Sequence, residues 1–156
     1  MKTMGARVVA GLNAGAPTLT LDVGRQDGIS LDAAVLSPEG LIGRVIKLSG
    51  SSSLVQPISH ASSGVGVMVE RTRFQAVLVG AGVERSVLKY VPKLEDVQIG
   101  DVLLSSGADG IYPPGIPVGV VESVSEDAGF FKRVQVRLMV EVRRVSEVLV
   151  TRGGTA

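Results

Sequence analysis

Three residue types in this chain occur in an order that could support acyl-transfer chemistry. His60, Asp101 and Ser105 or Ser106 follow one another as His, Asp and Ser, which is the chain order of one class of serine hydrolase. In such a site the imidazole takes the serine proton, the carboxylate orients the imidazole, and backbone N–H groups stabilise the oxyanion. A serine hydrolase is therefore one hypothesis for the function.

The residues around these candidates argue against hydrolysis. The stretch "SSGADG", residues 105–110, lacks the Gly-Asp-Ser-Gly arrangement that builds the oxyanion hole of chymotrypsin-like enzymes. His60 lies in "PISHASS", a polar stretch that is typical of an exposed loop. It is the one histidine, and there is no cysteine, so neither a multi-histidine nor a thiolate metal site can form. We expect no catalytic residue, no metal and no cofactor.

A basic cluster beside two phenylalanines raises a second alternative, a small-barrel nucleic-acid-binding module. Such modules combine a cationic groove with aromatic side chains on which bases stack. The formal net charge is only +1 and aromatic residues make up 3% of the chain, which favours a solvated outer strand face instead. We therefore expect no nucleic-acid partner. The cluster comprises Lys132, Arg133, Arg137, Arg143 and Arg144, next to Phe130 and Phe131.

The elements that must position these residues are predicted to be β-strands. Apolar residues make up 45% of the 156 residues, and with few aromatics the core must consist of Val, Leu, Ile and Ala. Twenty glycines and seven prolines supply frequent turns. Apolar and polar residues alternate with a period of two nearly everywhere, most clearly over residues 134–142. These patterns predict an all-β protein with no substantial helix.

Ten to twelve short strands in a chain of this length favour two small β-barrel lobes over one large sheet. We place the first lobe at residues 1–85 and the second at 86–156, with an approximate boundary and with exchange of strands between the lobes left open. Residues 1–5 and 151–156 are expected to be frayed or foreign to the native chain. Because the chain starts abruptly and has no apolar span, we interpret it as a piece of a longer protein.

The stretch "SSGADGIYPPGIPVG", residues 105–119, is predicted to be a rigid structural crossover that shapes one barrel. Its prolines cannot donate backbone hydrogen bonds, and its glycines can adopt positive φ without steric cost. The tyrosine gains a fixed place, either as a plug in the barrel end or as part of an interface. The crossover residues are Gly107, Gly110, Tyr112, Pro113, Pro114 and Gly115.

Phe130 and Phe131 are the first candidates for partner binding, with Tyr112 as the next. Adjacent residues of a strand point to opposite faces, so one of the two phenylalanines must leave the core. An exposed ring beside a turn indicates a contact surface. For self-association we expect an unpaired strand edge, other than that of "SLVQPIS", in which Pro57 blocks pairing.

Three stretches together carry a resemblance to a known family. The stretches "GLIGRVIKLSGSSSLVQPIS", "GDVLLSSGADGIYPPGIPVGVVESV" and "VQVRLMVEVRRVSEVLV" resemble the extracytoplasmic β-barrel domain of the rod shape-determining protein MreC. The similarity runs in order from about Leu19 to Val150, and the middle stretch is its most specific part. The resemblance implies two small barrels that are similar in topology to chymotrypsin-like proteases and lack their chemistry.

The resemblance also implies a function. Members of the family are non-catalytic scaffolds of the cell-wall elongation machinery, which self-associate as a dimer or filament and organise peptidoglycan synthases to maintain rod shape. The implied partners are a class B penicillin-binding protein and, through the full-length protein, MreD, RodA and MreB. The implied location is the periplasmic side of the cytoplasmic membrane. Contact with the membrane is expected only through an N-terminal anchor that this chain lacks.

Overall fold

The structure is a computed structural model that describes residues 2–11, 17–82, 85–126 and 129–152. Within these ranges the chain forms twelve strands and two single-turn 3₁₀ helices, η1 (Arg25–Asp27) and η2 (Val142–Arg144). The strands form two closed antiparallel barrels of six strands each, so the prediction of an all-β protein with two barrel lobes is confirmed. No helix of the described ranges is long and apolar enough to cross a membrane.

The first barrel combines the two ends of the chain. Its strands follow the order β1, β12, β3, β4, β5 and β2 around the barrel. Leu19, Leu21, Val45 and Val55 are fully buried inside it, because alternate residues of each strand point inward. The bounds are β1 (Thr3–Ala10), β2 (Leu19–Leu21), β3 (Ala34–Ser37), β4 (Gly40–Leu48), β5 (Ser53–Pro57) and β12 (Glu147–Thr151).

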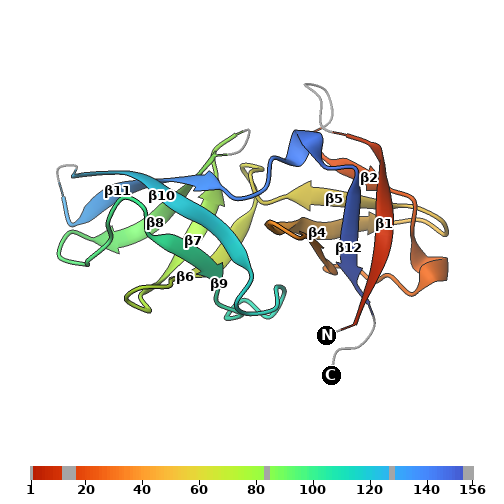
Figure 1. Ribbon diagram of the computed structural model, residues 1–156, viewed down its shortest axis with the longest axis horizontal. Helices are drawn as coiled ribbons and strands as arrows, with labels where there is room; N and C mark the ends of the chain where they lie inside the picture. Colours follow the sequence, from red (N-terminus) through yellow and green to blue (C-terminus); the bar gives the residue numbers. More distant parts are fainter. Residues whose placement is uncertain (1, 12–16, 83–84, 127–128, 153–156) are drawn as a thin grey trace. The chain divides into compact units, whose positions relative to one another are not determined.

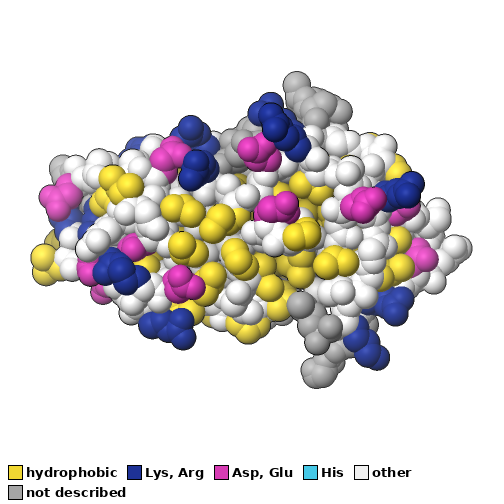
Figure 2. Space-filling view, viewed as in Figure 1, with side chains coloured by type: hydrophobic (Ala, Val, Ile, Leu, Met, Phe, Trp, Pro, Cys, Tyr) yellow, Lys and Arg dark blue, Asp and Glu magenta, His cyan; other side chains and the backbone are white. Residues whose placement is uncertain are grey.

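The second barrel consists of consecutive strands in the middle of the chain. They follow the order β10, β11, β8, β7, β6 and β9 around the barrel. Hydrophobic side chains also gather on its outer face, along β9 and β10 (Figure 2). The bounds are β6 (Gly64–Val69), β7 (Gln75–Gly80), β8 (Arg85–Pro92), β9 (Val102–Ser105), β10 (Pro117–Glu126) and β11 (Phe131–Leu138).

The division of the chain differs from the predicted boundary at residue 85. One compact unit comprises residues 1–57 and 140–156, and the other comprises residues 58–139. The reason is the pairing of β1 with β12, which lie side by side in Figure 1 and begin their register at Thr3 and Thr151. Residues 3–5 and 151, which we expected to fray, are therefore held in a ladder. Alternation predicts strands but not which distant strand each one joins.

The strand predicted over residues 134–142 ends earlier in the structure than the alternating pattern in the sequence. Val134, Val136 and Leu138 are buried in β11, but the strand stops at Leu138. Val140 and Val142 continue the pattern and are buried, yet they belong to the first unit, in which Val142 starts η2. The alternating pattern of residues 134–142 thus continues from the second unit into the first, across the boundary between residues 139 and 140.

Closure of the barrels removes the free strand edges that we expected for self-association. Among the described strands each one is hydrogen-bonded to a neighbour on both sides. Closure is what abolishes edges in β-barrels, because the first and last strands pair with each other. Any association of two copies must then use the outer faces or the loops of the barrels.

Candidate functional site

The crossover is anchored at its start by the hydroxyl group of Ser105. This residue is fully buried at the end of β9. Its Oγ donates a hydrogen bond to the Pro113 carbonyl at 2.6 Å and accepts one from the Ile116 N–H at 2.9 Å. The Gly115 N–H donates to the Ser105 carbonyl at 2.8 Å. One serine therefore ties both ends of the proline-rich segment together.

A second anchor is the carboxylate of Asp109, at the middle of the crossover. Its Oδ2 accepts a hydrogen bond from the Gly66 N–H of β6 at 3.0 Å, and its Oδ1 accepts from the Ile111 N–H at 3.1 Å. Three glycines of the crossover, Gly107, Gly110 and Gly115, have φ values of 77°, 74° and 84°. Residues with a Cβ rarely adopt such positive φ values. Through these contacts the crossover is attached to the second barrel.

Tyr112 lies in the packed interior, with 3% of its surface exposed. Its backbone N–H donates to Asp109 Oδ1 at 3.3 Å, which fixes the residue relative to the crossover. A ring that is buried to this degree offers no face to another protein. The structure thus argues against the partner-binding role for Tyr112.

The four candidates for the triad are engaged in separate contacts. His60 Nδ1 accepts a hydrogen bond from the Ser62 N–H at 3.0 Å, within its own turn. Asp101 is bound by Arg71, and the Ser105 hydroxyl is used by the crossover. Ser106 Oγ accepts from the Ala108 N–H at 3.2 Å. The described contacts do not assemble a nucleophile, a base and an orienting carboxylate.

Asp101 belongs to an ion-pair cluster with Arg71 and Asp96 that connects two loops of the second barrel. The guanidinium of Arg71 donates to the Asp101 carboxylate at 2.8 and 3.0 Å and to the Asp96 carboxylate at 2.7 Å. The hydrogen bond from Arg71 is the main reason that the pKa of each carboxyl lies below its usual range. The Gln98 N–H adds a hydrogen bond to Asp101 at 2.9 Å. The cluster fastens the loop before β9 to the turn after β6.

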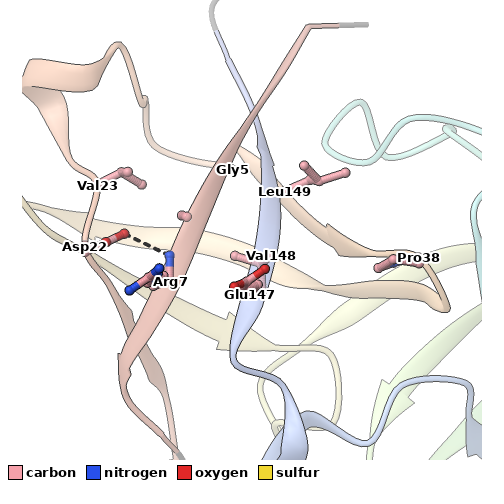
Figure 3. Close-up of a pocket in the computed structure, with 9 residues that line it drawn as sticks. Gly5, Arg7, Asp22, Val23, Pro38, Glu147, Val148 and Leu149 are labelled. Carbon is pink, nitrogen blue, oxygen red and sulfur yellow. Dashed lines mark hydrogen bonds between the residues drawn. The ribbon is translucent and has the colours of Figure 1, made fainter.

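A hollow of about 590 Å³ lies against β1 and β12 of the first barrel (Figure 3). Gly5 and Leu149 supply apolar lining, and Arg7 and Glu147 supply opposite charges. The backbone N–H of Arg7 donates a hydrogen bond to the Asp22 carboxylate at 2.8 Å, so this carboxylate is already engaged by the backbone. The described residues of the lining include no serine, cysteine or histidine, and they offer no nucleophile.

The second barrel carries an exposed cluster of four large apolar side chains, which we call the aromatic tip. It consists of Tyr90 (73% exposed), Leu94 (99%), Phe130 (87%) and Phe131 (46%). The Phe131–Pro92 pairing and the hydrogen bond from the Lys93 N–H to the Phe130 carbonyl bring its two segments together. Of these four residues the sequence pointed only to the two phenylalanines, at least one of which it required to be exposed, and both of them are exposed. Tyr90 and Leu94 were missed.

Tyr90 is exposed because β8 is irregular at this point. Leu88 pairs with Val134 and Val91 pairs with Lys132, so two residues of β8 lie opposite one residue of β11. This is a β-bulge, which leaves an extra residue unpaired and re-aims its side chain. Tyr90 has a φ of 60° there, and simple alternation would have directed it inward beside Leu88.

Two closed six-stranded barrels, without an assembled triad among the described residues, define the class as a double-barrel β protein. The chain matches the family model "Rod shape-determining protein MreC, barrel core" over residues 10–152. It therefore belongs to the MreC family, as the resemblance predicted.

Curated relatives agree with this assignment. The cell shape-determining protein MreC of Caulobacter vibrioides is 36% identical over 104 residues, covering 67% of this chain and 30% of that protein. The protein of the same name from Escherichia coli is 32% identical over 110 residues, covering 70% of this chain and 30% of that protein. The chain thus spans about a third of the length of these relatives.

Solved structures share the fold. The crystal structure of MreC from Pseudomonas aeruginosa has a TM-score of 0.92 and is 28% identical, covering 97% of this chain and 99% of that one. A complex between the penicillin-binding protein PBP2 and MreC from Helicobacter pylori contains a similar fold, with a TM-score of 0.72 and 17% identity. The match covers 97% of this chain and 100% of that one.

Proposed function

We propose that this chain is a non-catalytic scaffold domain of the cell-wall elongation machinery, which maintains rod shape by self-association and by organising peptidoglycan synthases. The observation that carries the proposal is the match to the MreC barrel core over residues 10–152. The curated relatives are named for their role in determining cell shape. The separate contacts of His60, Asp101 and Ser105 support a scaffold rather than a hydrolase.

The proposed location is the periplasmic side of the cytoplasmic membrane, with the full-length protein anchored in that membrane. The partner that we assign to this domain is a class B penicillin-binding protein, since a fold of this kind from Helicobacter pylori has been solved in complex with PBP2. Contacts with MreD, RodA and MreB are assigned to the full-length protein, and self-association as a dimer or filament to the outer barrel surface.

We assign synthase binding to the aromatic tip, and above all to Phe130 and Phe131. Aromatic side chains dominate the binding energy of many interfaces, at about 2 kcal/mol or more for each such anchor. Phe130 is 87% exposed, so its ring contributes little to the packing of the barrel. An apolar group held in water at a loop end gains free energy when a partner covers it.

The test is the double variant Phe130→Ser with Phe131→Ser, measured for binding to the class B penicillin-binding protein of the same organism. We expect loss of at least tenfold in affinity with an unchanged circular dichroism spectrum. The matched control is Val9→Ser with Leu31→Ser, which removes two exposed apolar side chains, 61% and 59% exposed, from the first unit. Unchanged binding by the folded tip variant would show that this surface is wrong.

The proposed absence of serine hydrolase activity is tested by a separate experiment. The chain is incubated with a fluorophosphonate probe, which labels activated serine nucleophiles. We expect no labelling, because the Ser105 hydroxyl is buried and bonded to Pro113 and Ile116. Labelling at Ser105 or Ser106 that disappears in His60→Ala would overturn the scaffold proposal in favour of a hydrolase.

A further inference from the structure

A strip of four cations runs along the outer face of β8 and β11, beside the aromatic tip. Arg85 and Lys89 project from β8, and Arg133 and Arg137 project from β11. All four are exposed, because their neighbours in each strand, such as Val134 and Val136, occupy the inward positions. We call these four residues the basic strip.

The charges of the basic strip are poorly compensated within the chain. Arg85 pairs directly with Arg137 across the ladder, an arrangement of like charges that destabilises a sheet. Arg85 contacts the Glu122 carboxylate at 2.5 Å. The other three strip residues form no ion pair with any described residue. Three of the four charges of the basic strip therefore have no ion-pair partner among the described residues.

The basic strip differs from the cluster that the sequence indicated. Lys132 turns toward the end of the barrel, and its Nζ donates to the Glu95 carbonyl. Arg144 pairs with Glu141 at 3.1 Å and belongs to η2 of the first unit. Conversely, Arg85 and Lys89 come from a strand 40 residues or more earlier and are brought beside β11 by the sheet.

The basic strip and the aromatic tip are continuous. At the bulge of β8, Lys89 and Tyr90 both lie between the pairs Leu88–Val134 and Val91–Lys132, opposite Arg133. Tyr90 in turn contacts Phe131, with ring centroids 5.7 Å apart. A partner that covers the tip at this end must also lie over, or next to, the cations of the strip.

We infer that the protein that docks on the aromatic tip carries a strip of aspartate and glutamate side chains, which lies along β8 and β11 in the complex. The inference rests on the proposed function and specifies the partner's surface. Complementary charge beside an apolar anchor raises the association rate and fixes the orientation of docking. Four cations on two adjacent antiparallel strands match an acidic strip of similar length.

The occupant is a protein rather than an anionic membrane because of the neighbouring strand. β10 pairs with β11 and carries Glu122, which is paired with Arg85 of the strip, and the exposed Glu126, which lies opposite Lys132 at the tip. A flat anionic surface that reached the strip would also approach these carboxylates. A shaped protein surface can place its acidic groups over β8 and β11 alone.

The test measures association kinetics of the chain with the class B penicillin-binding protein at about 50 mM and about 500 mM salt. We expect Arg133→Glu with Arg137→Glu to lower the association rate by about tenfold or more at low salt, with a much smaller effect at high salt. The control is Arg7→Glu with Lys47→Glu, which makes the same change in net charge on exposed residues of the first barrel. The control should retain most of the association rate.

The outcomes separate this inference from the proposed function. If the phenylalanine variant loses binding while the strip variant associates like the control, the inference is overturned and the proposed function stands. If neither variant changes binding, the tip assignment fails together with the inference. A third measurement uses vesicles of phosphatidylglycerol and phosphatidylethanolamine: strip-dependent vesicle binding with unchanged synthase association would overturn the inference in favour of a membrane.

Discussion

Tyr90 and Phe131 contact each other edge to face, with ring centroids 5.7 Å apart and ring planes at 74°. The contact joins the bulge of β8 to the first residue of β11. It depends on a left-handed backbone at Tyr90, with φ at 60°, which costs a residue with a Cβ roughly 1–2 kcal/mol. The tip thus places an aromatic ring in water at some cost to the stability of the barrel.

The first prediction uses that backbone cost. Tyr90→Gly and Tyr90→Ala both remove the ring, but only glycine adopts positive φ freely. We expect the glycine variant to be more stable than the alanine variant by about 1 kcal/mol, the reverse of the usual order within a strand. Urea unfolding of both variants measures the difference. An alanine variant of equal or greater stability would show that Tyr90 is not left-handed in solution.

The second prediction concerns two glycines with ordinary φ whose backbones contact another segment. A Cβ on Gly43 would overlap the Gln56 carbonyl in the first barrel, and a Cβ on Gly80 would overlap the His60 carbonyl in the second. We expect each alanine substitution to destabilise the chain by about 3 kcal/mol, because backbone atoms cannot move aside cheaply. Thermal and urea unfolding provide the measurement.

Gly5→Ala is the matched control for these variants, because an added Cβ there has nothing within 4 Å. It should leave stability unchanged or raise it by up to about 1 kcal/mol, through reduced freedom of the unfolded chain. If Gly43→Ala were as stable as Gly5→Ala, β4 and β5 would not approach each other at Gln56 as closely as the structure shows.

Local patterns predicted the strands well because a half-buried strand must alternate. The barrels and the scarcity of helix follow from that alternation and from the placement of glycine and proline. The boundary between lobes did not follow, because the pairing of Met4 with Val150 joins residues that have no local signal in common. Partner choice between distant strands depends on the packing of the whole barrel.

The surface was predicted less completely than the core. Phe130 and Phe131 could be found because two adjacent large apolar residues cannot both face inward. Tyr90 could not, since in "SVLKYV" a bulge reverses the phase that alternation assigns to it. Arg85 and Lys89 of the basic strip were also missed, because β8 becomes a neighbour of β11 only in the folded sheet.

The third prediction separates the two serines that the sequence grouped together. Ser105→Ala leaves the part-buried Pro113 carbonyl and Ile116 N–H without the partner that Ser105 supplies, at a cost of about 1–3 kcal/mol in unfolding free energy. Ser106→Ala removes one acceptor from the exposed Ala108 N–H, which water can replace, and should cost less than about 0.5 kcal/mol. Urea unfolding distinguishes them, and equal costs would contradict the anchoring role of Ser105.

The last prediction concerns acid stability. Arg71 and the Gln98 N–H hold the pKa of Asp101 below its ordinary value of 3.8, so the folded state favours the carboxylate. A lowered folded-state pKa contributes stability that is fully present above the unfolded pKa and is lost as pH falls through the folded value. We expect Asp101→Asn to cost about 2 kcal/mol at pH 7, where charge-assisted hydrogen bonds are lost. The difference between wild type and variant should shrink as the pH is lowered below about 4.

Urea unfolding at pH 7, 5 and 3 measures this difference. The control is Glu141→Gln, which breaks the exposed ion pair with Arg144 at 3.1 Å and should change stability by less than about 0.5 kcal/mol at each pH. The variant Asp101→Asn should run parallel to wild type between pH 7 and 5, because Asp101 stays ionised throughout that range. A gap that widens toward pH 3 would mean that protonating Asp101 favours the folded state, and the role assigned to Arg71 would be wrong.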